Sequence, residues 1–216
     1  MGISQMLMKL AEGMATSCWI FGITLLFSLP LGMVIAFGRM SKKRIVQGIT
    51  KIYISIMRGT PLMLQLMVVY FGPYYLFGIK ISPFYRNIAV VIGFVLNYAA
   101  YFAEIYRSGI ESMPVGQYEA AEILGYSKSQ TFLHIILPQV IKRILPPMGN
   151  EIITLVKDTS LANTIANKEI IMMAKEYSAK GLIWPLFSTA IFFLVFVGAL
   201  TLLLNWAEKK MDYFRC

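Results

Sequence analysis

Three long stretches without a charged residue constrain this chain more than any other feature of its sequence. They cover residues 13–38, 59–79 and 181–207, with 26, 21 and 27 residues respectively. About 20 mostly apolar residues are enough for a helix to cross the hydrocarbon core of a bilayer. The chain is also 57% hydrophobic and only 14% charged, whereas soluble domains carry about 25% charged residues. We therefore expect an all-α polytopic transmembrane helical bundle.

Five membrane spans are predicted. In chain order they are residues 14–38, 59–79, 87–103, 132–166 and 182–206. The third reaches full membrane length if its helix continues to about Tyr106. The fourth contains prolines and charged residues, but its apolar residues recur at nearly helical spacing. We expect it to pack inside the protein, with its prolines kinking or breaking the helix.

The distribution of Lys and Arg orients these spans. Thirteen lie on one side, in the loop 39–58, the segment 107–143 and the C-terminal tail, and six lie on the other side. Because cytoplasmic loops are enriched in Lys and Arg, we expect the N-terminus outside and the C-terminus in the cytoplasm. The net charge of +9 is then explained by Lys and Arg in cytoplasmic loops. No nucleic-acid partner is therefore expected. The first stretch does not resemble a removable signal peptide, and residues 1–216 are expected to form one domain.

Several classes of chemistry are not expected of this chain. Cys18 and Cys216 lie at opposite ends, so a structural disulfide is not predicted. His134 is the single histidine, which argues against a multi-histidine metal site or a histidine-based catalytic site. The sequence also lacks the glycine-rich phosphate-binding motif that ends in Lys-Ser/Thr. We therefore expect no enzymatic activity, no metal and no cofactor on this chain itself.

The segment 107–143 is a long loop that is neither disordered nor short. Its composition predicts a helix, a glycine turn and a second helix. Gly125 can adopt a positive φ and end the first helix, and Ser127 is a suitable N-cap for the second. Ala120 and Ala121 are expected to form a small-residue face that another protein can approach closely. Such a unit suits docking into a groove on a cytoplasmic partner.

The stretch 119–138 resembles the EAA loop of ABC importer permeases. It reads Glu-Ala-Ala, three residues, Gly, nine residues, Ile, one residue, Leu-Pro. The resemblance implies contact with a partner ATPase for Glu119, Ala120, Ala121, Gly125, Ile135, Leu137 and Pro138. His134 is assigned to the second helix of this loop without a chemical role.

Further segments resemble permeases for polar amino acids, the group that includes importers of histidine, arginine, glutamine and glutamate. They are Arg58-Gly59-Thr60-Pro61-Leu62 with Gln65, Ala99-Ala100-Tyr101 with Ala103-Glu104 and Arg107, Pro114 with Gly116-Gln117, and Lys157-Asp158-Thr159-Ser160-Leu161.

The resemblance implies a type I ABC importer permease fold in the bacterial cytoplasmic membrane. It also implies alternating access driven by two ATPase subunits, which bind the ATP. The other implied partners are a second permease copy or a sister permease, and an extracytoplasmic amino-acid-binding protein. Which amino acid is carried, and whether the permeases form a homodimer or a heterodimer, stay open.

Two carboxylates are candidates for contact with the ammonium group of an amino acid. A charge at membrane depth costs roughly 2.5–3.5 kcal/mol and usually faces a cavity or a partner, which draws attention to Glu104 and Asp158. Structural roles would account for them equally well: Glu104 pairs with Arg107 at i,i+3, and Asp158 pairs with Lys157 or caps a break before Thr159. Further candidates to hydrogen-bond the substrate are Asn97, Gln65, Thr159 and Ser160. Arg58 is at least as well explained as a positive-inside anchor.

Two other classes of membrane protein fit the sequence less well. A membrane-embedded enzyme or assembly factor would need catalytic residues clustered inside the spans, and one histidine with scattered carboxylates does not supply them. A secondary transporter would usually show inverted repeats, and none is evident in the sequence.

Overall fold

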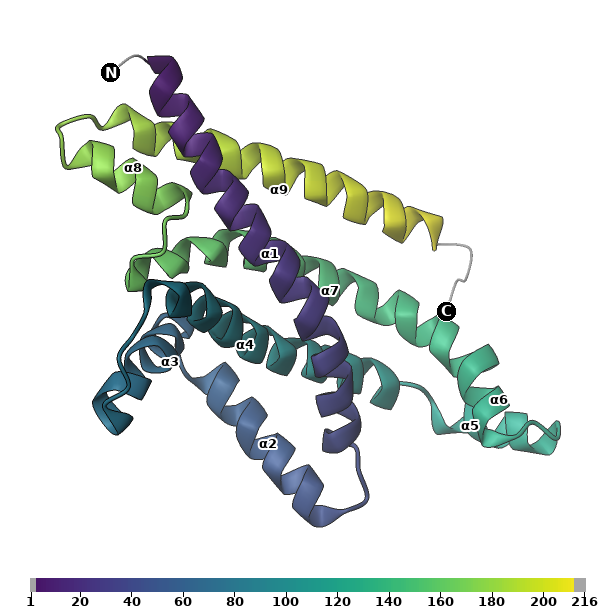
Figure 1. Cartoon of the computed structure of the whole chain (residues 1–216). Coiled ribbons are helices and arrows are strands. Elements are labelled where there is room, and N and C mark those ends of the chain that lie inside the picture. Colours follow the sequence, from purple (N-terminus) through teal and green to yellow (C-terminus); the bar gives the residue numbers. More distant parts are fainter. Residues whose placement is uncertain (1–2, 212–216) are drawn as a thin grey trace.

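The computed structural model describes residues 3–211 and is helical throughout, with short connecting segments (Figure 1). The elements in chain order are α1 (Ile3–Arg39), α2 (Arg44–Gly59), α3 (Leu62–Phe77), α4 (Pro83–Glu111), α5 (Val115–Ile123), α6 (Lys128–Gln130), the π-helical turn η1 (Thr131–Ile136), α7 (Leu137–Asp158), the 3-10 segment η2 (Thr159–Ile165), α8 (Ile170–Ser178) and α9 (Trp184–Lys210). The predicted all-α fold class is confirmed.

The membrane-spanning helices agree with three of the five predicted spans and differ from the other two. Among the described residues, α1, α4 and α9 are each long and apolar enough to cross a membrane. α2 and α3 are each too short to cross a membrane and reach the required length only when taken together. The two helices meet at an angle of 108°. The predicted span 59–79 is therefore half of a broken span. Its other half is α2, which lies within the segment expected to be a loop.

The predicted span 132–166 contains α7, which is long enough at 22 residues but is not among the helices apolar enough to cross a membrane. Its two prolines, Pro146 and Pro147, lie inside a continuous helix. The expected break comes later, at Thr159, where α7 gives way to the tighter turns of η2.

α1 crosses α4 through a line of small residues (Figure 1). Its buried positions recur about every four residues and include Ser17, Thr24, Ser28, Gly32 and Ala36. A Cβ on Gly32 would lie 2.9 Å from the Cβ of Phe102, closer than a real Cβ approaches, and 3.0 Å from the carbonyl oxygen of Ala99. Small residues allow helix backbones to pack closely in membranes, so this line sets how near α1 lies to α4.

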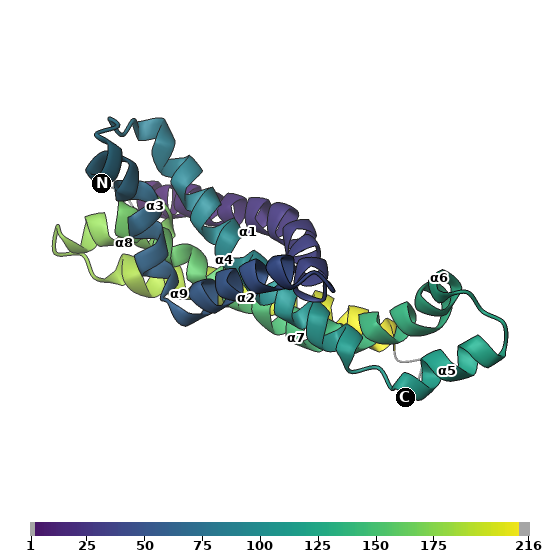
Figure 2. The same ribbon diagram turned by 90° about the horizontal axis from the view of Figure 1, so that it is seen from below.

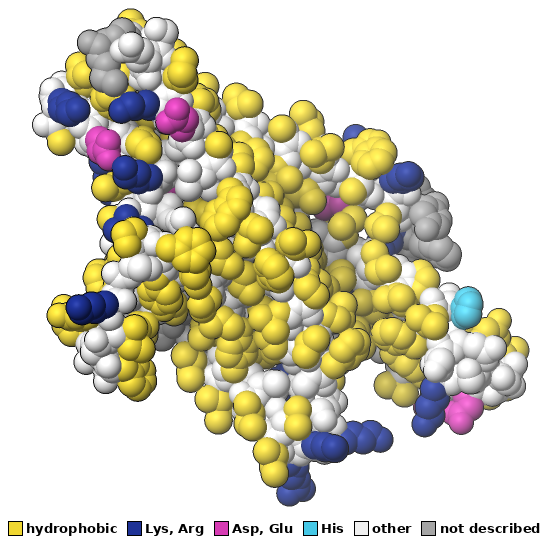
Figure 3. Space-filling model, in the orientation of Figure 1, with side chains coloured by type: hydrophobic (Ala, Val, Ile, Leu, Met, Phe, Trp, Pro, Cys, Tyr) yellow, Lys and Arg dark blue, Asp and Glu magenta, His cyan; other side chains and the backbone are white. Residues whose placement is uncertain are grey.

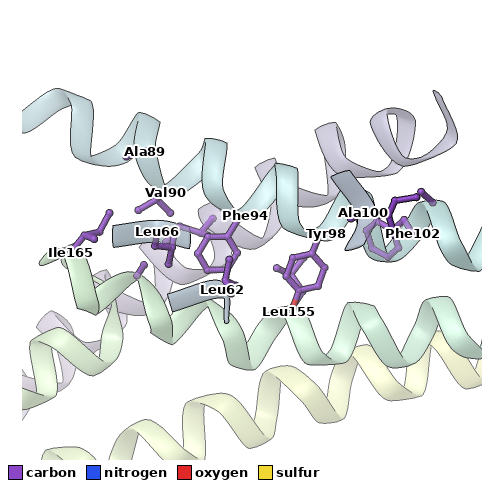
Figure 4. Close-up of a cluster of buried hydrophobic side chains, with 14 of the residues drawn as sticks. Leu62, Leu66, Ala89, Val90, Phe94, Tyr98, Ala100, Phe102, Leu155 and Ile165 are labelled. Atoms are coloured by element: carbon purple, nitrogen blue, oxygen red, sulfur yellow. The ribbon is translucent and has the colours of Figure 1, made fainter. Parts of the chain in front are cut away.

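The main core lies between α4 and its neighbours (Figure 4). Phe94 and Tyr98 of α4 face Leu62 and Leu66 of α3 and Leu155 of α7. Outside this core, apolar side chains cover most of the face seen in Figure 3, with Lys and Arg gathered toward its edges. α9 is the least buried of the long helices. A large apolar exterior is what a lipid-facing surface requires.

A buried carboxylate fixes the start of α8. The Glu169 side chain accepts hydrogen bonds from the backbone N–H groups of Ile171 and Met172, at 2.8 and 2.7 Å. Burial raises the pKa of this carboxyl to about 7, against the two backbone donors, which lower it. Next to it, Gly13 lets α1 approach the backbone of Ile170, because a Cβ there would lie 2.8 Å from the Ile170 Cα.

Candidate functional site

The segment predicted to dock on a partner forms a hairpin that projects from the bundle. α5 and α6 extend past the ends of α4 and α7, at the end of the molecule opposite α3 and α8 (Figure 2). Gly125 makes the turn with φ +80°, and its N–H donates to the carbonyl of Glu122 at 3.0 Å. Ser127 caps the second helix through a reciprocal pair of hydrogen bonds with Gln130. The glycine turn and the serine cap are both confirmed.

The base of the hairpin is tied to the bundle by side-chain hydrogen bonds. The amide groups of Gln117 and Gln139 donate to each other, at 3.0 and 2.9 Å. Arg143 of α7 donates to the carbonyl of Ser112 at 2.9 Å. A small apolar cluster around Ile136 fills the space beneath. The hairpin is therefore anchored on both α4 and α7.

The surface of the hairpin differs from the expected small-residue face. Glu119 and Ala120 are exposed, but Ala121 is only 1% exposed and packs within the hairpin. A partner cannot approach both alanines, because Ala121 faces inward. The most exposed apolar side chains are Ile123 and Leu124, at 87% and 74%. The sequence pattern did not single them out, although two adjacent apolar residues before a glycine turn are a usable signal.

The remaining residues of the EAA resemblance lie nearer the bundle. Ile135, Leu137 and Pro138 are half-buried where η1 passes into α7. Between the two arms lies a cavity of about 360 Å³. Its lining residues are Tyr118, Glu122, Tyr126, Lys128, Thr131 and Phe132. The hairpin thus presents exposed apolar residues at its tip, with a polar and aromatic cavity behind them.

Gln65 and Asn97, two of the predicted substrate ligands, bind each other and the break between α2 and α3. The Gln65 amide donates to the carbonyls of Met57 and Thr60, at 2.9 and 3.1 Å, and to the Thr60 hydroxyl at 2.8 Å. The Asn97 amide donates to the Met57 carbonyl at 3.1 Å and to the Gln65 side-chain oxygen at 3.0 Å. We call this set of four residues the elbow. Its amide N–H groups are directed at protein acceptors.

Glu104 lies on α4 and is engaged by arginines. Arg107 donates to both of its carboxylate oxygens, the shortest contact being 2.6 Å. Arg58 of α2 approaches to 3.9 Å. The alternative anticipated from the i,i+3 spacing, a pair with Arg107, is therefore present. Arg107 also pairs with Glu111, which extends the network to the end of α4.

Asp158 ends α7 and faces α4. Its carboxylate accepts a hydrogen bond of 2.7 Å from the hydroxyl of Tyr98, and it makes no capping bond to the start of η2. The hydroxyls of Thr159 and Ser160 donate to the backbone carbonyls of Val156 and Lys157 respectively. Only Asp158 of these three therefore has its polar group directed across to another helix.

Glu151 is a carboxylate that sequence reasoning missed. It lies on α7 seven residues before Asp158, is half-buried, and interacts electrostatically with Asp158 and with Arg58. Residues seven apart on a helix share a face, so the spacing was a signal available in the sequence. Tyr98 and Tyr101 of α4 lie on the facing side, with ring centroids 6.2 Å apart. The α4–α7 boundary therefore combines carboxylates, tyrosines and the Arg58 guanidinium.

The sequence of this chain is similar to membrane components of known transport systems. Residues 28–213 match a family described as the binding-protein-dependent transport system inner membrane component. The L-cystine transport system permease protein TcyB of Bacillus subtilis is 34% identical over 89% of this chain and 82% of that protein. The arginine transport system permease protein ArtQ of Bacillus subtilis is 36% identical over 93% of this chain and 91% of that protein.

Solved structures give the same picture of the fold. A chain of an amino acid ABC transporter crystallised with histidines superposes with a TM-score of 0.87 at 28% identity, over 96% of each chain. The inward-facing methionine transporter MetNI superposes with a TM-score of 0.72 at 15% identity, over 98% of this chain and all of the other. The second likeness supports the fold alone.

Proposed function

This chain belongs to the family of inner-membrane components of binding-protein-dependent transport systems, and on that premise we propose that it passes a polar amino acid inward by ATP-driven alternating access. It is a permease subunit of the amino-acid ABC transporter class and a multi-pass membrane protein. The direction of transport, the coupling to ATP and the substrate class belong to the proposal. So does the topology, with the N-terminus outside and the C-terminus in the cytoplasm.

Coupling to the ATPase is assigned to the hairpin. The observation that carries this assignment is its projection beyond the bundle with Ile123 and Leu124 exposed at the tip (Figure 2). Exposed neighbouring apolar residues away from lipid mark a protein interface. The base formed by Gln117, Gln139 and Arg143 supports transmission of force from the tip to α4 and α7.

The substrate path is assigned to the α4–α7 boundary. An amino acid carries an ammonium group, and a carboxylate at membrane depth is a natural partner for it. Asp158 has one oxygen engaged by Tyr98, and Glu151 lies on the same face of α7. The proposed partners are two ATPase subunits, a second permease copy or sister permease, and an extracytoplasmic binding protein.

Reconstitution tests the function directly. The complex of permease, ATPase and binding protein is placed in vesicles, and uptake is measured with neutral, acidic and basic amino acids in competition. We expect uptake that requires ATP and is inhibited by only part of the panel. Uptake that proceeds without ATP, driven by an ion gradient, would show a secondary transporter instead.

A matched pair of variants tests the path. Asp158→Asn removes the proposed contact with the ammonium group, so uptake is expected to fall about tenfold or more. Glu176→Gln changes an exposed carboxylate on α8 and is expected to leave uptake unchanged. Equal uptake by the two variants would remove Asp158 from the path.

A further inference from the structure

The elbow solves a physical problem created by breaking a span. A helix that ends inside a membrane leaves its last carbonyls without partners, and each unsatisfied group costs free energy there. At the end of α2 these include the carbonyls of Met57 and Thr60, which accept from the Gln65 amide. Asn97 adds a bond from α4 and is itself only 4% exposed. The last turn of α2 is therefore fixed relative to α4.

Arg58 lies in this fixed turn. Its guanidinium carbon is 5.3 Å from the centre of the Tyr101 ring, a cation–π contact. Its nearest carboxylate oxygen, on Glu104, is 3.9 Å away, too far for a hydrogen bond. Glu104 is already engaged by Arg107. Within residues 3–211, Arg58 donates no hydrogen bond, and its side chain is 45% exposed.

The space beside Arg58 is open and positively charged. A cavity of about 210 Å³ is lined by Arg39, Lys51, Ile54, Ser55, Arg58 and Glu104. Three of these six residues are cations, and the one anion is paired with Arg107. A small anionic group is the ligand that such a cavity favours.

The charges around Arg58 have the polarity of a free amino acid. Glu151 of α7 supplies negative charge on one side and interacts electrostatically with Arg58 itself. A zwitterion placed between them would direct its ammonium group toward α7 and its carboxylate toward α2. Arginine suits the second role, because its planar guanidinium matches a carboxylate with two parallel hydrogen bonds.

We propose that Arg58 binds the α-carboxylate of the transported amino acid, and that Gln65 and Asn97 are positioning residues that hold it in place. This inference rests on the proposed function and extends it to the chemical group that is recognised. It replaces the role of Arg58 as an anchor at the membrane surface. An anchor would need no elbow, and Arg58 is the fifteenth residue of α2, whereas Arg44 begins that helix.

The test compares an amino acid with its α-amide, which lacks the carboxylate charge. Binding to the permease–ATPase complex in lipid nanodiscs is measured without the binding protein, because that protein would itself discriminate between the amino acid and its amide. The probes are L-glutamine, L-cystine and L-arginine, with L-glutaminamide, L-cystine diamide and L-argininamide. For the amino acid that binds, wild type is expected to prefer it to the amide by about tenfold or more, since hydrogen bonds between charged groups are strong.

Arg58→Gln is expected to lower affinity for the amino acid by about tenfold or more and to leave affinity for the amide nearly unchanged. Arg58→Lys keeps the charge and is expected to restore part of the preference. Arg44→Gln, which changes an exposed cation at the start of α2 outside this cavity, is expected to keep it in full. A preference that survives in Arg58→Gln, or one lost in every variant including Arg44→Gln, overturns the assignment.

Two controls keep the outcomes distinct. Thermal unfolding in detergent shows whether Arg58→Gln is folded, and Arg58→Lys carries the test if it is not. ATP-dependent uptake by the wild-type complex tests the proposed function separately. If uptake occurs but wild type does not distinguish the amino acid from its amide, the role of Arg58 is wrong while the function stands. If no uptake of any amino acid occurs, the function and the inference fail together.

Discussion

The hairpin and the elbow treat polarity in opposite ways. At the tip of the hairpin, Ile123 and Leu124 are apolar and exposed. In the elbow, Gln65 and Asn97 are polar and bonded to protein acceptors. Covering exposed apolar residues with a partner lowers the free energy, whereas buried polar residues need hydrogen-bond partners within the fold. The hairpin surface therefore suits binding to another protein, and the elbow stabilises the bend between α2 and α3.

The largest effect is expected at the turn of the hairpin. Gly125→Asp places a side chain at φ +80°, which costs roughly 1–2 kcal/mol for an L-residue, and adds a charge at the proposed docking surface. Co-purification with the ATPase and ATP-driven uptake are both expected to be lost. Gly181→Asp is the matched control, since Gly181 has φ +82° and open space around it at the other end of the molecule. Normal uptake by Gly125→Asp would refute the coupling assignment.

The next effect is expected in the elbow and is one of stability. Asn97→Leu removes two hydrogen bonds and leaves the side-chain oxygen of Gln65 without its donor. Loss of a buried partner costs about 1–3 kcal/mol, which thermal unfolding of the purified protein would reveal. Asn205→Leu, on the exposed surface of α9, is expected to change little. If both variants unfold alike, the elbow does not hold the bend.

A smaller effect separates docking from folding within the hairpin. Ile123→Ser changes a residue that is 87% exposed, so the melting temperature is expected to stay the same. Affinity for the ATPase is expected to fall about tenfold, because burying an isoleucine contributes roughly 1.5–3 kcal/mol. Ile183→Ser, an exposed isoleucine at the opposite end, serves as the control in the same binding measurement. A drop in melting temperature without a change in affinity would contradict this division.

The smallest effect is expected from the cap. Ser127→Ala removes the acceptor for the Gln130 N–H, which costs about 1 kcal/mol of local helix stability. Faster amide exchange in α6 is expected, with uptake nearly unchanged. Ser129→Ala changes an exposed serine in the same turn and should leave the exchange rates as they are. Equal protection in both variants would mean that the cap does not stabilise the hairpin.

The features that the sequence predicted well are local ones. Gly125 and Ser127 act within a few residues of their own positions, and the pair of Glu104 with Arg107 lies within one helix turn. The long apolar helices followed from composition alone. The inward orientation of Ala121 was not foreseen, because it depends on how the two arms of the hairpin pack.

The features that escaped prediction join distant parts of the chain. Asn97 is 32 residues from Gln65, and Tyr98 is 60 residues from Asp158. A polar residue near membrane depth signals that a partner exists, but one sequence does not say whether that partner is a substrate or another side chain. Gln65 and Asn97 were predicted to hydrogen-bond the substrate, whereas in the structure their amide groups hydrogen-bond the protein itself. The broken span escaped because the uncharged stretch 59–79 is by itself long enough for a span, so the basic segment before it was predicted to be a loop.

The broken span also bears on how the chain enters the membrane during synthesis. α2 and α3 have 16 residues each, so neither half is long enough to insert as a finished span. The bond that Asn97 gives to the end of α2 cannot form until α4 has left the ribosome, about forty residues after Met57. α2 and α3 must therefore wait in the insertion machinery, or at the membrane surface, until α4 arrives. Assembly of this bundle is in this respect a matter of timing as well as of hydrophobicity.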